Sequence, residues 1–266
     1  NHLAPFATDS AEAAHLRAVA EADESSLSQK IQAHFALGLL EDRADRPTEA
    51  FAHYSMANGL RPGTYDRDFQ ERLVAGQRLA DWGESPVVPS SGEPVMVFVT
   101  GMPRSGATLL ETCLWRHSQV ASIGESTALS ATATAVRRHV AQTHGDAGWW
   151  NWTGRLSAAE IAQFRDLFLR QALGPGTADA AVVVDKMPLN CFEMGLARLL
   201  LPEAKFVFLS RHPLDMGLSN FVANFAVGNR FSTRLEAIGH MTRCVYRSVR
   251  DYQHRLGDVL RVQSYE

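Results

Sequence analysis

The chain reads Val95-Met-Val-Phe-Val-Thr100, then Gly101-Met-Pro-Arg-Ser-Gly106-Ala-Thr108, and then Leu109-Leu-Glu-Thr-Cys-Leu114. The first run is apolar and rich in β-branched residues, which predicts a buried strand, and the third has a helical composition. The glycines that bound the middle run let the backbone curl tightly. Successive N–H groups and the positive end of the following helix can then converge on an anion, so this segment predicts a phosphate-binding loop.

The loop has the glycine spacing of the nucleotide P-loop but a different cation. Ala107 stands where that motif has lysine, and the cation is Arg104, inside the loop. Ser105 and Thr108 would add hydroxyl donors. A purely structural turn is the alternative, and the flanking strand and helix argue against it.

Strands alternate with helices along the rest of the chain. The predicted strands cover 95–100, 180–185, 205–210 and 259–264, and the predicted helices cover 106–117, 127–143, 157–173, 189–201, 213–226 and 233–255. Such alternation implies right-handed crossovers and a mainly parallel sheet that is covered on both faces. We therefore predict an α/β, P-loop-containing three-layer fold whose site lies beyond the carboxyl ends of the strands.

Residues 1–92 have a different pattern and are predicted to form an all-α region with a linker, followed by the α/β domain over 93–266. Within the all-α region, six residues fall at the offsets of a tetratricopeptide repeat, namely Leu37, Gly38, Ala50, Tyr54, Ala57 and Pro62. Such repeats can offer a concave peptide-binding surface. They can also act as a helical buttress or a homodimer contact, and so few units favour this second reading.

Composition and charge exclude several classes of protein. The 266 residues are 45% hydrophobic and 21% charged, which excludes collagen, coiled coil and wholesale disorder. A net charge of -3 gives no overall attraction for nucleic acid or anionic membrane. The 3 cysteines and 10 histidines show no ligand spacing, so no metal is expected. No apolar run is long enough for a membrane span and no secretory segment is visible, so we expect a cytoplasmic protein by default.

The run from Gly101 to Leu110 resembles the 5′-phosphosulfate loop of sulfotransferases that use 3′-phosphoadenosine 5′-phosphosulfate (PAPS). Its Pro-Arg-Ser-Gly core resembles the branch that includes protein-tyrosine sulfotransferases and bacterial tetratricopeptide-repeat sulfotransferases. Ala107 departs from the pattern, because many members carry threonine there. The resemblance implies that the loop residues binding PAPS are Gly101, Pro103, Arg104, Ser105, Gly106, Ala107, Thr108 and Leu109.

A second phosphate site is expected at the end of the strand 205–210. Arg211 follows this strand and Ser219 lies eight residues later on a predicted helix, which resembles the order and spacing of the family's 3′-phosphate site. Taken without the resemblance, Arg211 could pair with Asp215 instead. Tyr265 and Glu266 look like the family's strand-terminal Tyr-Glu, whose tyrosine approaches the nucleotide.

Three residues are predicted to carry the chemistry. Glu125 lies 21 positions after Arg104 and follows a short strand-like stretch, which predicts a carboxylate near the sheet edge. It resembles the catalytic glutamate of the tyrosine-sulfotransferase branch, which implies a general base. Its alternative is an acid that stabilises a helix N-terminus. Lys186 leaves an apolar strand in a run that resembles the family's loop with a catalytic lysine; its alternative is a solvated loop lysine. Arg104 would neutralise the phosphosulfate, and Asp185 would orient Lys186.

The predicted reaction is transfer of a sulfuryl group from PAPS to a hydroxyl acceptor, with 3′-phosphoadenosine 5′-phosphate (PAP) as product and no metal. The acceptor is a tyrosyl peptide, a glycan or a small molecule. Helical repeats favour a peptide, and Trp149, Trp150 and Trp152 favour a ring or sugar. One alternative is a P-loop kinase, supported by Asp185 but opposed by Ala107. The other is a tetratricopeptide scaffold whose nucleotide-binding domain is inactive.

Overall fold

The computed structural model describes residues 7–79, 85–86, 92–145, 154–226 and 228–266. The three tryptophans at 149, 150 and 152 lie outside these residues. The chain forms two compact units. The helical unit comprises Asn1–Arg67 and Pro213–Met241, and the sheet unit comprises Asp68–His212 and Thr242–Glu266. These two units are defined by contacts in space. The boundary at residue 92 is defined by a change in sequence pattern and stays a prediction.

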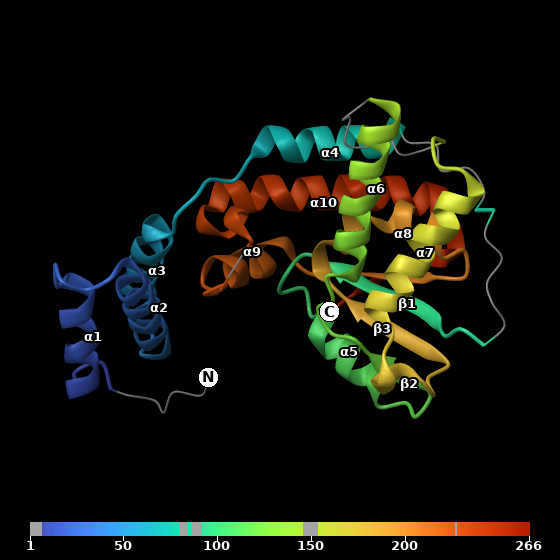
Figure 1. Cartoon of the computed structure of the whole chain (residues 1–266). Helices are drawn as coiled ribbons and strands as arrows, with labels where there is room; N and C mark the ends of the chain where they lie inside the picture. Colours follow the sequence, from blue (N-terminus) through green and yellow to red (C-terminus); the bar gives the residue numbers. More distant parts are fainter. Residues whose placement is uncertain (1–6, 80–84, 87–91, 146–153, 227) are drawn as a thin grey trace. The chain divides into compact units, whose positions relative to one another are not determined.

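Five parallel strands form the sheet unit's centre (Figure 1). Their order is β2-β3-β1-β4-β5, so β1 lies in the middle. The strands are β1 (Val95–Gly101), β2 (Val120–Ser122), β3 (Val182–Lys186), β4 (Lys205–Ser210) and β5 (Leu260–Ser264). The predicted α/β fold with a parallel sheet is confirmed. The edge strand β2 corresponds to the short strand-like stretch before Glu125, which is too brief to give a clear periodicity.

Helices cover both faces of the sheet. On one face, α5 (Ala107–Trp115) packs through a buried cluster that consists of Val99, Ala107, Val184 and Leu209. Successive residues of a strand point to opposite faces, so Phe98 lies on the other side. There its ring centroid is 6.0 Å from that of Phe168 on α7 (Ala158–Ala172). The sheet is therefore buried on both sides, as the apolar strands predict.

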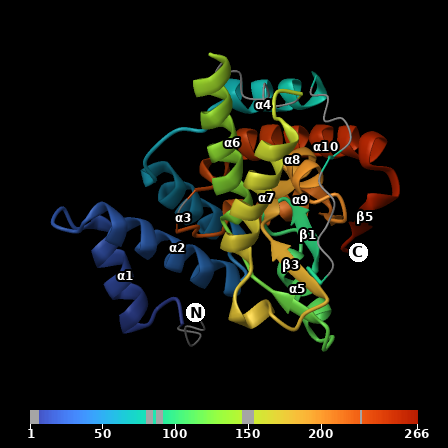
Figure 2. The same ribbon diagram turned by 45° about the vertical axis from the view of Figure 1, so that its right-hand side comes forward.

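Four further helices contribute to the sheet unit: α4 (Arg67–Leu79), α6 (Ala128–His144), α8 (Met194–Leu200) and α10 (Leu235–Leu256). The first part of α10, up to Met241, is counted with the helical unit. Both views show α6 beside α7 and α4 along α10 (Figures 1 and 2). The predicted helix 189–201 is interrupted. A 3₁₀ turn covers Pro188–Phe192, and α8 begins after it. Glu193 separates the two, because its φ of -114° lies outside helical geometry.

The helical unit contains α1 (Ala11–Glu21), α2 (Leu27–Arg43), α3 (Pro47–Leu60) and α9 (Pro213–Phe221). Gly38 lets α2 and α3 approach closely, since a Cβ there would lie 2.8 Å from the Tyr54 ring. Both residues are among the six at the repeat offsets. Assignment to the tetratricopeptide class stays a prediction.

Helix α9 ends at Phe221 rather than at the predicted residue 226. The Phe221 carbonyl accepts a hydrogen bond from Asn58 Nδ2 at 2.8 Å, and the Phe221 ring stacks on Phe51 with a centroid separation of 5.2 Å. Both partners belong to α3. The end of α9 is therefore set by contacts with a distant part of the sequence.

None of the helices in the described part of the chain combines the length with the apolar character that a membrane crossing requires.

Candidate functional site

The loop between β1 and α5 has a constrained backbone. Arg104 has a φ of +70°, a left-handed conformation that is sterically unfavourable for a residue with a side chain. Gly106 has a φ of +99°, and a Cβ there would lie 2.3 Å from the ring of Tyr265. Glycine at 106 is thus required both by the backbone conformation and by the approach of the tyrosine.

The centre of the loop contains a buried hydroxyl group and a helix N-terminus that lack protein hydrogen-bond partners among the described residues. Ser105 is fully buried, and its hydroxyl oxygen has no hydrogen-bond partner among the described residues. Gly106 precedes α5 and has no side chain to cap the helix, which begins at Ala107. A buried, unsatisfied hydroxyl beside an uncapped helix N-terminus fits an anion such as a phosphate. The predicted loop from Gly101 to Leu109 surrounds this point.

Arg211 lies at the carboxyl end of β4, next to the same loop. Its Nη1 donates a hydrogen bond to the Arg104 carbonyl at 3.1 Å, and its Cζ is 4.9 Å from the centroid of the Tyr265 ring. Its Nε is buried without a partner among the described residues. The Tyr265 N–H donates to the Ser210 carbonyl at 2.9 Å, which aligns the ends of β4 and β5. The structure therefore brings Arg211, Tyr265 and the loop together.

Ser219 lies on α9, in the helical unit, whereas Arg211 belongs to the sheet unit. The proposed sharing of one phosphate by these two residues stays a prediction.

Glu125 and Lys186 form an ion pair at the carboxyl end of β3. Lys186 Nζ donates to Glu125 Oε1 at 2.7 Å, and the Lys186 backbone N–H donates to the Gly124 carbonyl at 3.0 Å. The lysine side chain is only 8% exposed, whereas the glutamate side chain is 60% exposed. A buried ammonium therefore holds a carboxylate that remains open to an incoming molecule.

Glu111 is a residue that sequence reasoning missed. It lies on α5, one turn after Ala107, and its Oε2 is 3.7 Å from Lys186 Nζ. Its Oε1 accepts a hydrogen bond from Ser122 Oγ at 2.5 Å. Because α5 starts at the loop that contains Arg104 and Gly106, Glu111 links that loop to the Glu125–Lys186 pair. The available signal was an acid within the otherwise apolar run Leu109-Leu-Glu.

Asp185 precedes Lys186 and is completely buried. The pKa of Asp185 is raised from its ordinary value of 3.8 to about 7. Burial is the main cause, the negative charge of Glu111 adds to it, and the positive charge of Lys186 opposes the change. Asn190 Nδ2 donates to Asp185 Oδ1 at 3.3 Å, while Oδ2 has no hydrogen-bond partner among the described residues. Near neutral pH, Asp185 is therefore present in both its protonated and its ionised form, and Oδ2 is the oxygen that can carry the proton.

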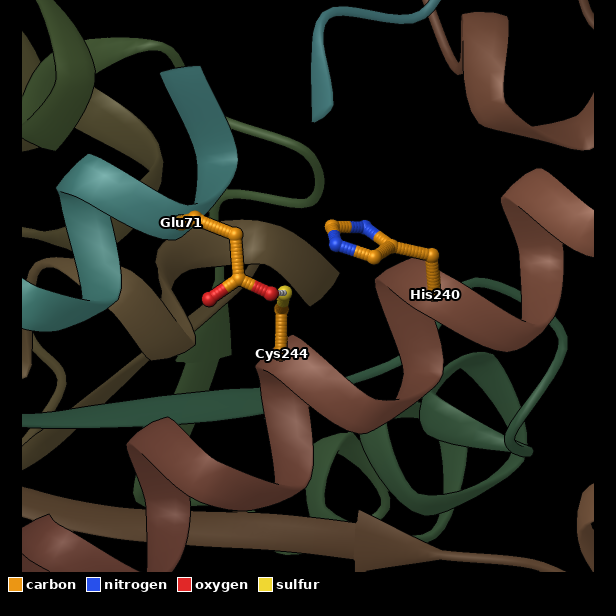
Figure 3. Close-up of side chains that lie close together, drawn as sticks. All are labelled: Glu71, His240 and Cys244. Carbon is orange, nitrogen blue, oxygen red and sulfur yellow. Dashed lines mark hydrogen bonds between the residues drawn. The ribbon is translucent and has the colours of Figure 1, made fainter. Parts of the chain in front are cut away.

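A separate group of polar side chains lies between α4 and α10. Figure 3 shows the Cys244 thiol against the Glu71 carboxylate, to which its Sγ donates at 3.8 Å. The same carboxylate accepts from Arg247 Nη1 at 2.7 Å. Burial raises the pKa of Cys244 to about 11, so the thiol stays protonated. This group holds α4 to α10 through hydrogen bonds.

Two comparisons relate this chain to known proteins. Residues 94–266 match the model of a family described as "Sulfotransferase family". The chain is also similar to an uncharacterized protein of Aquifex aeolicus (strain VF5), with 29% identity over 233 residues. That overlap covers 82% of this chain but 29% of the Aquifex protein, so the chain spans less than a third of that relative's length. Because the family match covers more than half of the chain and includes the whole sheet and the loop between β1 and α5, this protein belongs to the sulfotransferase family.

Proposed function

We propose that the protein transfers a sulfuryl group from PAPS to a hydroxyl acceptor, with Glu125 as general base. The observation that carries this proposal is the 2.7 Å contact between the exposed Glu125 carboxylate and the buried Lys186 ammonium. Helix α5 supports it, because the helix begins at the phosphate loop and its Glu111 reaches Lys186. A base, a cation and an anion-binding loop are the three parts that the reaction needs.

The residues present fit the nucleotide tail of PAPS. The unsatisfied Ser105 hydroxyl and the uncapped start of α5 would receive the 5′-phosphosulfate, with Arg104 as its counter-charge. Arg211, whose Nε is buried and unpaired within the described residues, would take the 3′-phosphate together with Ser219. The Tyr265 ring, seated on Gly106, would approach the nucleotide.

In the proposed mechanism Glu125 accepts the proton of the acceptor hydroxyl as its oxygen forms a bond to sulfur. The bond from sulfur to the bridging oxygen breaks in line, and its electron pair leaves with the phosphate of PAP. Lys186 and Arg104 stabilise the negative charge that gathers on the departing oxygen. Before the acceptor arrives, the hydrogen bond from Lys186 keeps the Glu125 carboxylate correctly oriented. No metal is required in this scheme.

A P-loop kinase is a weaker interpretation. Ala107 stands at the position of the P-loop lysine, so a direct cationic contact with the transferred phosphate is missing. A kinase would also use Asp185 as an ionised ligand near magnesium. Magnesium-dependent ATP turnover would support the kinase instead.

The test is transfer of radiolabelled sulfate from PAPS to a panel of tyrosyl peptides, glycans and phenols. We expect a labelled product with the wild-type protein, and a loss of about 100-fold or more in rate with Glu125→Gln, a typical effect of removing a general base. Glu24→Gln, which changes an exposed acid in the turn after α1, is the matched control and should keep full activity.

In parallel, calorimetry measures the affinity of the same proteins for PAP. Glu125→Gln should bind PAP as the wild type does, because Glu125 is assigned to the acceptor side. PAP binding without transfer to any acceptor would favour the inactive scaffold. Failure of the wild-type protein to bind either PAP or PAPS would overturn the proposal.

A further inference from the structure

The helical unit contains a cavity that the proposed reaction does not use. Its volume is about 710 Å³, within the range of sites that hold small organic ligands or short peptide segments. Residues of α2, of the turn after α3 and of the segment after α9 line it, including Leu27, Ile31, Gln32, Arg61, Asn224 and Arg230.

Two arginines of this cavity are held by neutral groups. Arg61 Nη2 donates to the Phe225 carbonyl at 2.9 Å, and its Nη1 donates to Ser232 Oγ at 3.2 Å. Arg230 Nη1 donates to the Pro62 carbonyl. Within the described part of the chain, neither guanidinium forms an ion pair with a carboxylate.

The two guanidinium charges also act on each other. Burial lowers the pKa of Arg61, and the positive charge of Arg230 lowers it further. Like charges close together raise the energy of the ligand-free protein, and an oxyanion placed beside both would relieve this repulsion. The protein as a whole has a net charge of -3, so the positive charge here is local.

The backbone makes room for Arg230. Gly63 has a φ of +89°, and a Cβ there would lie 1.7 Å from Arg230 Nη1 and 2.4 Å from its Cζ. The guanidinium therefore rests directly on the glycine. A side chain at 63 would displace the arginine without removing its charge.

A second cavity of about 560 Å³ adjoins the first and shares Arg61 and Thr233 with it. Its lining adds two further arginines, Arg67 and Arg234, and one acid, Glu236. The excess of positive charge therefore continues beyond the first cavity.

We propose that the cavity between α2 and the segment after α9 binds a carboxylate-bearing ligand, with the carboxylate between Arg61 and Arg230. Planar guanidinium groups match the geometry of a carboxylate. Leu27, which is 48% exposed, and Ile31 offer an apolar surface for the rest of the ligand. The exposed amides of Gln32 and Asn224 can pair with amide groups of that ligand.

The test measures binding to the whole chain, without PAPS, by calorimetry at low salt. The probes are a blocked Glu-Glu-Leu peptide, its Gln-Gln-Leu counterpart, citrate and inorganic phosphate. We expect the Glu peptide to bind, the Gln peptide to bind about tenfold more weakly or worse, and added salt to reduce the affinity. Binding of citrate but not of the peptide would identify a small carboxylate as the source, and binding of both would show that the carboxylate alone decides.

Variants locate the site. Arg230→Gln should weaken carboxylate binding by about tenfold, whereas Arg43→Gln, an exposed arginine at the end of α2, should leave it unchanged. Gly63→Ala should also weaken it while keeping the net charge; circular dichroism confirms that each variant is folded. Arg104→Gln should leave it unchanged, which separates this cavity from the phosphate loop. Equal binding of the Glu and Gln peptides, binding of phosphate alone, or unaltered binding by Arg230→Gln would overturn the proposal.

Discussion

Asp185→Asn tests whether the carboxyl group at the end of β3 holds a proton in the folded protein. The pKa of this group is 3.8 when it is free and about 7 in the folded protein, where burial is the main cause. The folded state therefore binds more protons than the unfolded state between these two values. Hence the free energy of unfolding of the wild type should fall as the pH rises through this interval.

The size of the effect follows from the interval. From 3.8 to about 7 is roughly three pH units, and each unit corresponds to about 1.4 kcal/mol, so the full effect is about 4 kcal/mol. Asparagine has the same shape and does not titrate. Its Oδ1 can still accept the hydrogen bond from Asn190, which is 3.3 Å long in the wild type. As the pH rises from 4 to 8, we expect the free energy of unfolding of the variant to increase by about 4 kcal/mol relative to that of the wild type.

Urea denaturation at pH 4, 5, 6, 7 and 8 measures both proteins on one scale. Asp258→Asn, at an exposed position in the turn before β5, is the matched control and should follow the wild type at every pH. A difference between Asp185→Asn and the wild type that stays constant across the range, within about 0.5 kcal/mol, would show that the carboxyl group is ionised in the folded state. The reasoning about its burial would then be wrong.

Two further predictions concern the phosphate loop and its helix. Gly106→Ala should weaken PAP binding by about tenfold, because a Cβ at that position would lie 2.3 Å from the Tyr265 ring. Calorimetry measures the affinity for PAP. An unchanged affinity would mean that the ring is not fixed at this position. Glu111→Gln removes the second-largest cause of the raised pKa of Asp185, so the fall in stability should move to lower pH, which the same urea series detects. An unchanged pH dependence of the free energy of unfolding would show that Glu111 does not influence Asp185.

The sequence predicts most of the sheet because its strands are buried on both faces. The apolar runs that became β1, β3 and β4 need no partner in order to be recognised, and the loop after β1 is marked by its two glycines. The pairing of Glu125 with Lys186 is a different matter. Each residue could be expected at a strand end, but only the parallel alignment of β2 with β3 places the two ends together.

What the sequence could not predict depends on contacts between distant segments. Helix α9 stops at Phe221 because Asn58, on α3, takes up the Phe221 carbonyl. Glu111 stands out in the sequence only as an acid in an apolar run, and its partners Lys186 and Ser122 come from two different strands. Local periodicity carries no information about either contact.

The bond from Asn58 to Phe221 has a consequence for how this protein can be divided by recombination or engineering. Residues 213–241 are encoded between β4 and β5, yet they complete a compact body with the first 67 residues. A polypeptide that started at β1 would carry this inserted segment without the helices that cover its aromatic side chains. Replacing the amino-terminal helices would therefore require matching changes in residues 213–241, more than a hundred residues downstream.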